Sequence, residues 1–254
     1  MRMTFLGTGT SSGVPVVGCD CEVCHSTDPR DMRLRSSVMI ETDNTRVVVD
    51  CGPDFRSQML RVPFRKIDGL LLTHIHYDHV GGLDDLRPFC VFGDIHVMAD
   101  ASTAEQLHHT MPYVFAEHLY PGVPRINLDV ITPYSTFMIG DIPVTPFRVF
   151  HGRLPILAFR FGKTAYITDM KRISSADENV VKGVETLIVN ALRFEKTHAA
   201  HMLVDDAIAF ANRIGVRRVF LTHVTHEIGL HDDANAKLPE HVRFAYDGMT
   251  IEGL

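Results

Sequence analysis

Short runs of apolar residues, each bounded by glycine, asparagine or aspartate, recur along the whole chain. They are rich in valine, isoleucine, phenylalanine and threonine, which is the composition of β-strands. The sequence TDNT, residues 42–45, predicts a hairpin turn between two of them. The predicted strands are 3–7, 37–42, 46–50, 68–74, 94–100, 136–149, 156–162, 164–169, 186–191, 217–223 and 243–253.

Apolar residues at helical spacing are found in fewer segments. The last of them, before Gly215, has a clear helical pattern and a glycine stop. No internal repeat, low-complexity tract or linker divides the chain, so we expect one domain over residues 1–254, with mixed sheets and helices packed outside them. The predicted helices are 54–61, 81–90, 101–111, 174–183 and 201–214.

Polar residues that can bind metals or take part in catalysis stand where the predicted strands end. Asp50, His74, His151, Asp169 and His223 each close or directly follow an apolar run. Side chains that leave strand ends on one rim can converge in space while lying far apart in the sequence. This placement indicates an active site on a rigid scaffold.

The charge of the chain narrows the classes of partner. Its formal net charge is −6 with histidine neutral, so it lacks the basic excess of a protein with a long nucleic-acid footprint. A small polyanionic substrate fits if metal ions supply the positive charge. The N-terminus lacks the apolar segment of a signal peptide, and no apolar run approaches the roughly 18 residues of a membrane span. We therefore expect a cytoplasmic protein that does not contact membranes.

Fifteen histidines in 254 residues direct the search to metal spacing. The stretch LLTHIHYDHVGGL holds His74, His76, Asp78 and His79 directly after a hydrophobic run. Alternate residues after a strand point the same way, so His74 and His76 can face one metal. The turn that follows lets Asp78 and His79 face a second metal, and imidazole with carboxylate suits Zn²⁺ or Mn²⁺. The pattern predicts a metal site.

THIHYDHVGG resembles the signature of the metallo-β-lactamase superfamily. The resemblance covers essentially the whole chain and implies an α+β fold, the four-layer αββα sandwich with a dinuclear metal site at one edge. Asp50 matches the strand-end aspartate of the family, which is expected to orient a ligand or the motif turn. The implied metal ligands are His74, His76 and His151 for one ion, Asp78, His79 and His223 for the other, and Asp169 shared between them.

Two divalent ions at such a site, Mn²⁺ or Zn²⁺, activate a water molecule and neutralise oxygens of the electrophile. The full set of five histidines and two aspartates favours phosphoester hydrolysis within the superfamily. Leaving alkoxides also need a proton, and phosphodiesterase branches place a histidine at the start of a corresponding helix. His198 and His201 both lie there, and we favour His201 because it directly precedes the helical run. The predicted catalytic residues are His201 and Asp78.

Within the superfamily, the chain is most similar to the PhnP-type phosphodiesterases of the carbon–phosphorus lyase pathway, through LGTGTSSGVP, THIHYDHVGGLDDLRP, LTHVTH and YDGM. This resemblance implies a small or cyclic ribose phosphodiester as substrate and is compatible with a homodimer. One alternative is a tRNase Z-like endonuclease, although no basic insertion appears between residues 81 and 150. Another is a non-catalytic metal-binding accessory protein of a cofactor pathway, although the full ligand set is present.

Three of the five cysteines, Cys19, Cys21 and Cys24, lie within GCDCEVCHS. In a cytoplasmic protein they are expected to be thiols or metal ligands rather than disulfides. Their spacing suits zinc but lacks a fourth ligand, for which His25 is adjacent. The PhnP-like branch instead uses a histidine at the position of His226, so the resemblance implies a structural zinc site of Cys19, Cys21, Cys24 and His226.

Overall fold

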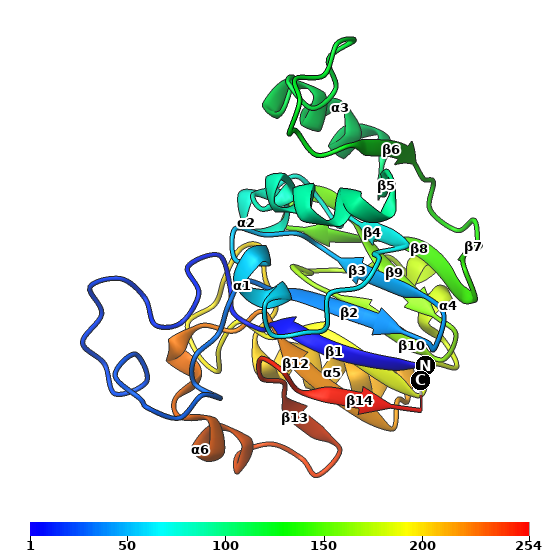
Figure 1. Ribbon diagram of the computed structural model, residues 1–254. Helices are drawn as coiled ribbons and strands as arrows, with labels where there is room; N and C mark the ends of the chain where they lie inside the picture. Colours follow the sequence, from blue (N-terminus) through cyan, green and yellow to red (C-terminus); the bar gives the residue numbers. More distant parts are fainter. Residues whose placement is uncertain (254) are drawn as a thin grey trace.

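The computed structural model describes residues 1–253, which form two seven-stranded sheets with helices on their outer faces (Figure 1). The first sheet has the order β14-β1-β2-β3-β4-β5-β6 and the second the order β13-β12-β11-β10-β9-β8-β7. The strands of the first sheet are β1 (Arg2–Gly7), β2 (Ser37–Glu41), β3 (Arg46–Val49), β4 (Gly69–Leu71), β5 (Ile95–Ala99), β6 (Ile126–Val130) and β14 (Thr250–Glu252). Those of the second are β7 (Phe137–Ile139), β8 (Ile142–His151), β9 (Leu154–Phe161), β10 (Thr164–Ile167), β11 (Thr186–Asn190), β12 (Arg218–Thr222) and β13 (Val242–Phe244).

The helices are short and lie outside the sheets. They are α1 (Phe55–Met59), α2 (Tyr77–Val80), the 3₁₀ helix η1 (Leu83–Phe92), α3 (Ala101–Thr110), α4 (Ser175–Val181), α5 (Val204–Ile214), the 3₁₀ turn η2 (His226–Ile228) and α6 (His231–Asn235). None of them, in the part of the chain that the structure describes, has the length and apolar character of a membrane span.

Three hydrophobic clusters hold the layers together, which confirms the αββα sandwich. The central cluster joins the facing surfaces of the two sheets, for example Val47 of β3 with Phe159 of β9. A second cluster packs α1 and η1 against the first sheet, and a third packs α4 and α5 against the second. Because both faces of each sheet are covered, the central strands are buried along their whole length, as in β3 and β11.

The strand directions place the carboxyl ends of several strands at one edge of the sandwich. β3 to β6 are mutually parallel, as are β10 to β13, and β8 runs in the direction of β10 because both are antiparallel to β9. The carboxyl ends of β3 and β4 in one sheet therefore lie on the same edge as those of β8, β10 and β12 in the other. These are the strands that the predicted site residues follow.

Most predicted strands are present, and the turn at 42–45 is confirmed by the β2–β3 hairpin and the hydrogen bond from Thr42 N to Thr45 O. Two predicted runs each give two strands. The run 136–149 reverses direction at Gly140, where φ is 54°. The run 243–253 splits because β13 joins the second sheet and β14 the first.

The predicted helices differ from the observed ones at two places. The segment 81–90 is not an α-helix but the 3₁₀ helix η1, which contains Pro88, a residue without the N–H that an α-helix interior uses. The helix expected from residue 201 begins at Val204, where the Asp206 carboxylate accepts a hydrogen bond from Leu203 N. Its predicted end at Gly215 is confirmed, with φ 71° in the left-handed region.

Candidate metal centre

The HxHxDH segment leaves β4 and turns into α2 at Tyr77, with His76 as the residue before the helix. Two glycines allow this turn to pack directly on the loop after β3. A Cβ atom at Gly52 would lie 2.1 Å from the carbonyl oxygen of Asp78, and one at Gly82 would lie 2.1 Å from the carbonyl oxygen of Gly52. Neither position tolerates a side chain, so the glycines set how closely the motif approaches the first sheet.

Three of the strand-end residues have left-handed backbone conformations that non-glycine residues rarely adopt. The φ angles are 64° at Asp50, 55° at Asp169 and 55° at His223. Asp50 and His223 directly follow β3 and β12, and Asp169 lies two residues after the end of β10. Such strain persists where the surrounding structure imposes it and is concentrated at functional sites.

The first predicted ligand group, His74, His76 and His151, is gathered from both sheets. Each residue offers one nitrogen, and these atoms all lie within 4.8 Å of one another. His74 Nε2 and His76 Nδ1 are 3.0 Å apart. Nδ1 of His151 lies 3.1 Å from the carbonyl oxygen of Ala200, so it donates there and leaves Nε2 for another partner.

The second predicted group, Asp78, His79 and His223, meets the same distance criterion. His79 Nε2 lies 3.3 Å from Asp78 Oδ2 and 3.2 Å from Asp169 Oδ2. His223 Nε2 lies 3.1 Å from Asp169 Oδ1. Asp169 also forms a cluster with His74 and His79, so its carboxylate lies close to members of both groups.

The hydrogen bonding of these side chains is incomplete in a way that metal ions would satisfy. Although carboxylate oxygens lie near two of them, three buried ring nitrogens form no hydrogen bond among residues 1–253: His79 Nε2 and both nitrogens of His223. Buried polar atoms in folded proteins nearly always have a partner. The donor set is imidazole nitrogen and carboxylate oxygen, which suits Zn²⁺ and Mn²⁺. The residues therefore fit divalent cations.

A charged pair stands behind the second group. Asp50 Oδ2 lies 2.7 Å from His79 Nδ1, and both side chains are fully buried. Burial raises the pKa of Asp50. Burial alone would lower the pKa of His79, but the carboxylates of Asp50 and Asp169 outweigh it and raise that pKa well above its usual value. In the metal-free protein at neutral pH, the pair therefore retains a proton.

In the first group, burial determines the protonation of two histidines. Burial lowers the pKa of His74 well below its usual value and also lowers that of His76, so both imidazoles are neutral at pH 7. For Asp169, burial acts to raise the pKa, but His223 and His79 hold it well below the usual range. His74 and His76 thus offer neutral imidazoles and Asp169 an ionised carboxylate, which are the forms that bind metals.

Thr73 is a functional residue that sequence reasoning missed. Its hydroxyl lies 2.9 Å from Nδ1 of His74, and both its hydroxyl and its backbone N–H donate to the Asp50 carboxylate. It links the strand-end aspartate to the first histidine of the motif. Its position directly before His74 was the available signal, but a threonine at a strand end is too common to single out.

His201 lies against the centre and His198 stands behind it. His201 Nε2 is 2.9 Å from Asp169 Oδ1, while the Nδ1 atoms of His201 and His198 are 3.0 Å apart. Burial lowers the pKa of His201 to about 4, against the opposing effect of the Asp169 carboxylate. Of the two candidates, His201 is the one in contact with a predicted ligand.

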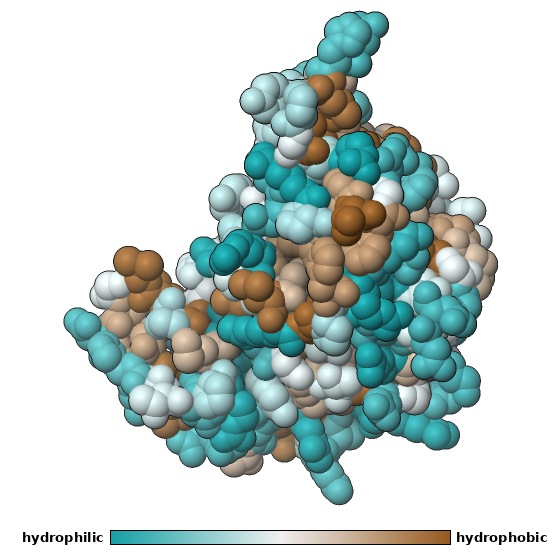
Figure 2. All heavy atoms as spheres, viewed as in Figure 1, coloured by the Kyte–Doolittle hydropathy of each residue, from teal (hydrophilic) through white to brown (hydrophobic). Residues whose placement is uncertain are grey.

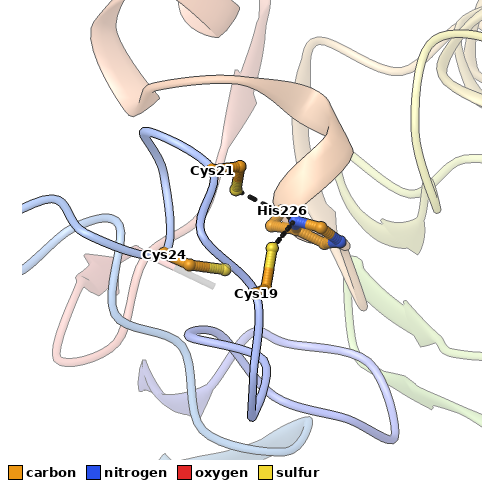
Figure 3. A group of neighbouring side chains, drawn as sticks. All are labelled: Cys19, Cys21, Cys24 and His226. Atoms are coloured by element: carbon orange, nitrogen blue, oxygen red, sulfur yellow. Dashed lines mark hydrogen bonds between the residues drawn. The ribbon is translucent and has the colours of Figure 1, made fainter.

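The three cysteines of the N-terminal loop surround a histidine from the far end of the chain (Figure 3). His226 Nδ1 lies 3.2 Å from Cys21 Sγ and 3.4 Å from Cys19 Sγ. Cys24 completes a group whose ligand atoms are all within 4.8 Å of one another. His25 is not part of the group, since its Nδ1 lies 3.2 Å from the backbone oxygen of Cys21.

The electrostatics of this cluster suit a metal thiolate site. The hydrogen bond from His226 lowers the pKa of Cys21 to about 6, whereas burial raises that of Cys24 to about 11. A thiol with a pKa near 6 is largely ionised at neutral pH, and thiolate is the form that binds zinc. The remaining cysteines, Cys51 and Cys90, are buried among apolar residues, away from this cluster.

A hydrophobic groove lies between α1 and η1, apart from both candidate metal sites. Figure 2 shows hydrophobic side chains on the face that carries α1 and η1, with hydrophilic residues around them. The groove between these helices has a volume of about 660 Å³ and is lined by residues such as Phe55, Leu60, Phe64 and Phe89. No predicted ligand lines it, so the chemistry belongs to the strand-end edge and not to this groove.

Comparison with known proteins agrees with this geometry. The profile of the β-lactamase superfamily domain matches residues 45–224. The crystal structure of a diphosphatase from the PhnP family is 35% identical, covers 100% of this chain and 98% of its own, and superposes with a TM-score of 0.91.

Two curated proteins are also similar in sequence. An octanoyltransferase of Porphyromonas gingivalis is 42% identical over 250 residues, which is 98% of this chain and 51% of that protein. A ribonuclease Z of Methanococcus maripaludis is 26% identical over 170 residues, which is 63% of this chain and 48% of that protein. The match thus spans about half the length of these two relatives.

Proposed function

Because this chain belongs to the β-lactamase superfamily and, within it, to the PhnP family, we propose that it is a dinuclear metal-dependent phosphodiesterase acting on small or cyclic phosphodiesters. It is a metallo-hydrolase by family. One observation carries the finer proposal: five histidines and two aspartates from the strand ends of both sheets converge, with buried imidazole nitrogens that lack a partner.

The predicted ligands would hold two divalent cations, with His74, His76 and His151 at one and Asp78, His79 and His223 at the other. Bound there, the cations would activate water and neutralise the phosphate oxygens. Asp169 would be shared between them. Asp50 and the carbonyl oxygen of Ala200 each accept a hydrogen bond from Nδ1 of an inward-facing histidine, which orients Nε2.

In this proposal, His201 would protonate the leaving oxygen. Its Nε2 faces Asp169, and its Nδ1 is in contact with His198. Burial lowers the pKa of His201 to about 4, so a general acid here depends on the substrate itself. A bound phosphate brings negative charge next to the imidazole, which favours the imidazolium form. The His201 imidazole would then be protonated, and able to act as the general acid, when substrate is bound.

The diphosphate linkage is a second candidate, favoured by the diphosphatase at 35% identity. A ribonuclease Z-like activity has less support. The segment that protrudes from the first sheet, β5–α3–β6 (Figure 1), lies within residues 81–150, which contain three arginines and no lysine. It therefore lacks the positive charge that gripping a tRNA backbone requires. A non-catalytic role has less support because all seven predicted ligands are retained.

A substrate panel tests the proposal. The metal-depleted protein is reconstituted with Mn²⁺ or Zn²⁺ and assayed on 1,2-cyclic ribose phosphate, 2′,3′-cyclic nucleotides, a nucleoside diphosphate, bis-p-nitrophenyl phosphate and a precursor tRNA. We expect turnover of the small esters and none of the tRNA. His76→Ala should abolish turnover with the circular dichroism spectrum unchanged, whereas His96→Ala, at an exposed histidine paired with Asp129, should not. Undiminished turnover by His76→Ala would contradict the proposal.

A further inference from the structure

Tyr77 is a large, solvent-exposed aromatic residue within the HxHxDH segment of the candidate metal centre. It stands between two predicted ligands, His76 and Asp78, and its side chain is 70% exposed. His76 is itself exposed, unlike the other histidines of the motif. Two neighbouring residues of the segment, His76 and Tyr77, therefore expose an aromatic ring to solvent.

The ring of Tyr77 packs against the backbone at Gly81. A Cβ atom at Gly81 would lie 2.7 Å from Cε2 and 2.8 Å from Cζ of Tyr77. One edge of the ring thus rests against a glycine one turn further along, where any side chain would displace it. A ring held in this way loses little conformational entropy when a ligand stacks on it.

The phenol group does not explain why the ring is there. Another exposed tyrosine, Tyr134, does have a polar partner, since its hydroxyl donates a hydrogen bond to Asp177. The hydroxyl of Tyr77 makes no hydrogen bond within residues 1–253. What distinguishes Tyr77 from a solvated surface residue is the contact of its ring with Gly81 and its place between two predicted metal ligands.

We propose that Tyr77 is a stacking platform that selects phosphoester substrates carrying an aromatic base, that is, nucleotides rather than sugar phosphates alone. Every nucleobase has a flat π-face, and stacking on an aromatic side chain tolerates any base. With the phosphate at the metal ligands, the base would lie over the ring beside them. This inference rests on the proposed function, because it takes the strand-end cluster as the phosphate site.

The test uses matched ligands with and without a base. The Mn²⁺-loaded protein is titrated calorimetrically with AMP and with ribose 5-phosphate, and KM is measured for 2′,3′-cyclic AMP and for ribose 2,3-cyclic phosphate. We expect the base-bearing ligand of each pair to bind more tightly. Tyr77→Ala should reduce this preference roughly tenfold, which is about 1.4 kcal/mol, and Tyr77→Trp should retain it.

Tyr120→Ala is the matched control, since Tyr120 is 79% exposed and belongs to no cluster of predicted ligands. It should leave the preference unchanged. An equal loss for both members of a pair in Tyr77→Ala, or no loss at all, would overturn the inference. If no ester is hydrolysed but AMP still binds through Tyr77, the proposed function fails and the base platform stands.

Discussion

The carboxylate of Asp50 lies 2.7 Å from Nδ1 of His79, and neither side chain is exposed to solvent. The contact joins a residue that ends β3 to the last histidine of the motif, 29 positions later. It orients the imidazole so that Nε2 points at Asp78 and Asp169. The aspartate expected from the sequence to orient the motif therefore contacts one of its histidines directly.

Asp50→Asn should weaken metal binding at the His79 group by roughly 10- to 100-fold, because an amide cannot accept the imidazole proton as strongly as a carboxylate. Metal titration with an absorbance indicator measures this. Asp129→Asn provides the control, since it breaks an equally short His–Asp contact, with His96, on the surface. Equal affinities in the wild type and Asp50→Asn would argue that the carboxylate serves packing alone.

Metal uptake should release a proton. The Asp50–His79 pair holds one in the metal-free protein because the pKa of His79 is raised. A metal at His79 Nε2 competes with that protonated state, so affinity should increase with pH across the neutral range. Adding Zn²⁺ in weak buffer with a pH indicator measures the protons directly. His79→Gln should release fewer, and a release unchanged by this substitution would contradict the assignment.

His201→Ala should reduce turnover of alkoxide-leaving substrates by about 10²- to 10⁴-fold and that of bis-p-nitrophenyl phosphate much less, since nitrophenolate needs little protonation. His198→Ala should have the smaller effect, because His198 contacts His201 and not Asp169. Steady-state kinetics on both substrate types decides the matter. Equal losses on the two types would mean that His201 positions the phosphate instead of donating a proton.

Cys21→Ser and His226→Ala should each purify with one fewer zinc ion per chain than the wild type, by elemental analysis. Both remove a member of the cluster in Figure 3, and structural zinc sites need four ligands. His25→Ala is the control for the neighbouring histidine and should retain the ion, because His25 contacts only the backbone of Cys21. Loss of zinc in His25→Ala alone would reverse the assignment.

Asp247 should make stability depend on pH. Burial raises its pKa to about 6 from 3.8. Between these values the folded protein binds more protons at this group than the unfolded chain does, so this contribution to stability falls as pH rises from 4 to 6. Its size is roughly 3 kcal/mol. Urea unfolding of wild type and Asp247→Asn should show their difference changing over that interval, and a flat difference would refute the shift.

Much of the site could be predicted because its residues follow recognisable local patterns. Asp50, His151, Asp169 and His223 each end an apolar run, and the HxHxDH segment is itself a local signal. Their convergence needs only the alignment of parallel strands at one edge. What pattern could not reveal is how each ring is oriented, since Thr73 and the carbonyl of Ala200 act through contacts set by tertiary structure.

Other elements were missed, or were predicted with another geometry, because their local signals are weak or misleading. β6 is a short edge strand without a fully buried residue, so INLDV alternates apolar and polar residues but is not one of the apolar runs from which the strands were predicted. α2 is a four-residue turn, too short for helical periodicity. η1 has apolar residues at helical spacing, but Pro88 and tertiary packing give it 3₁₀ geometry. In each case local sequence was outweighed by the contacts that the rest of the fold imposes.

His223 and His226 belong to different candidate metal sites but are three residues apart. Val224, between them, donates to the carbonyl oxygen of Thr8 and accepts from the N–H of Thr10, in the loop that leads to the cysteines. Both sites therefore share one short piece of backbone. Coupling between two binding sites is reciprocal. If zinc at the cysteines raises the metal affinity of the strand-end cluster by some factor, metal at that cluster raises the zinc affinity of the cysteines by the same factor.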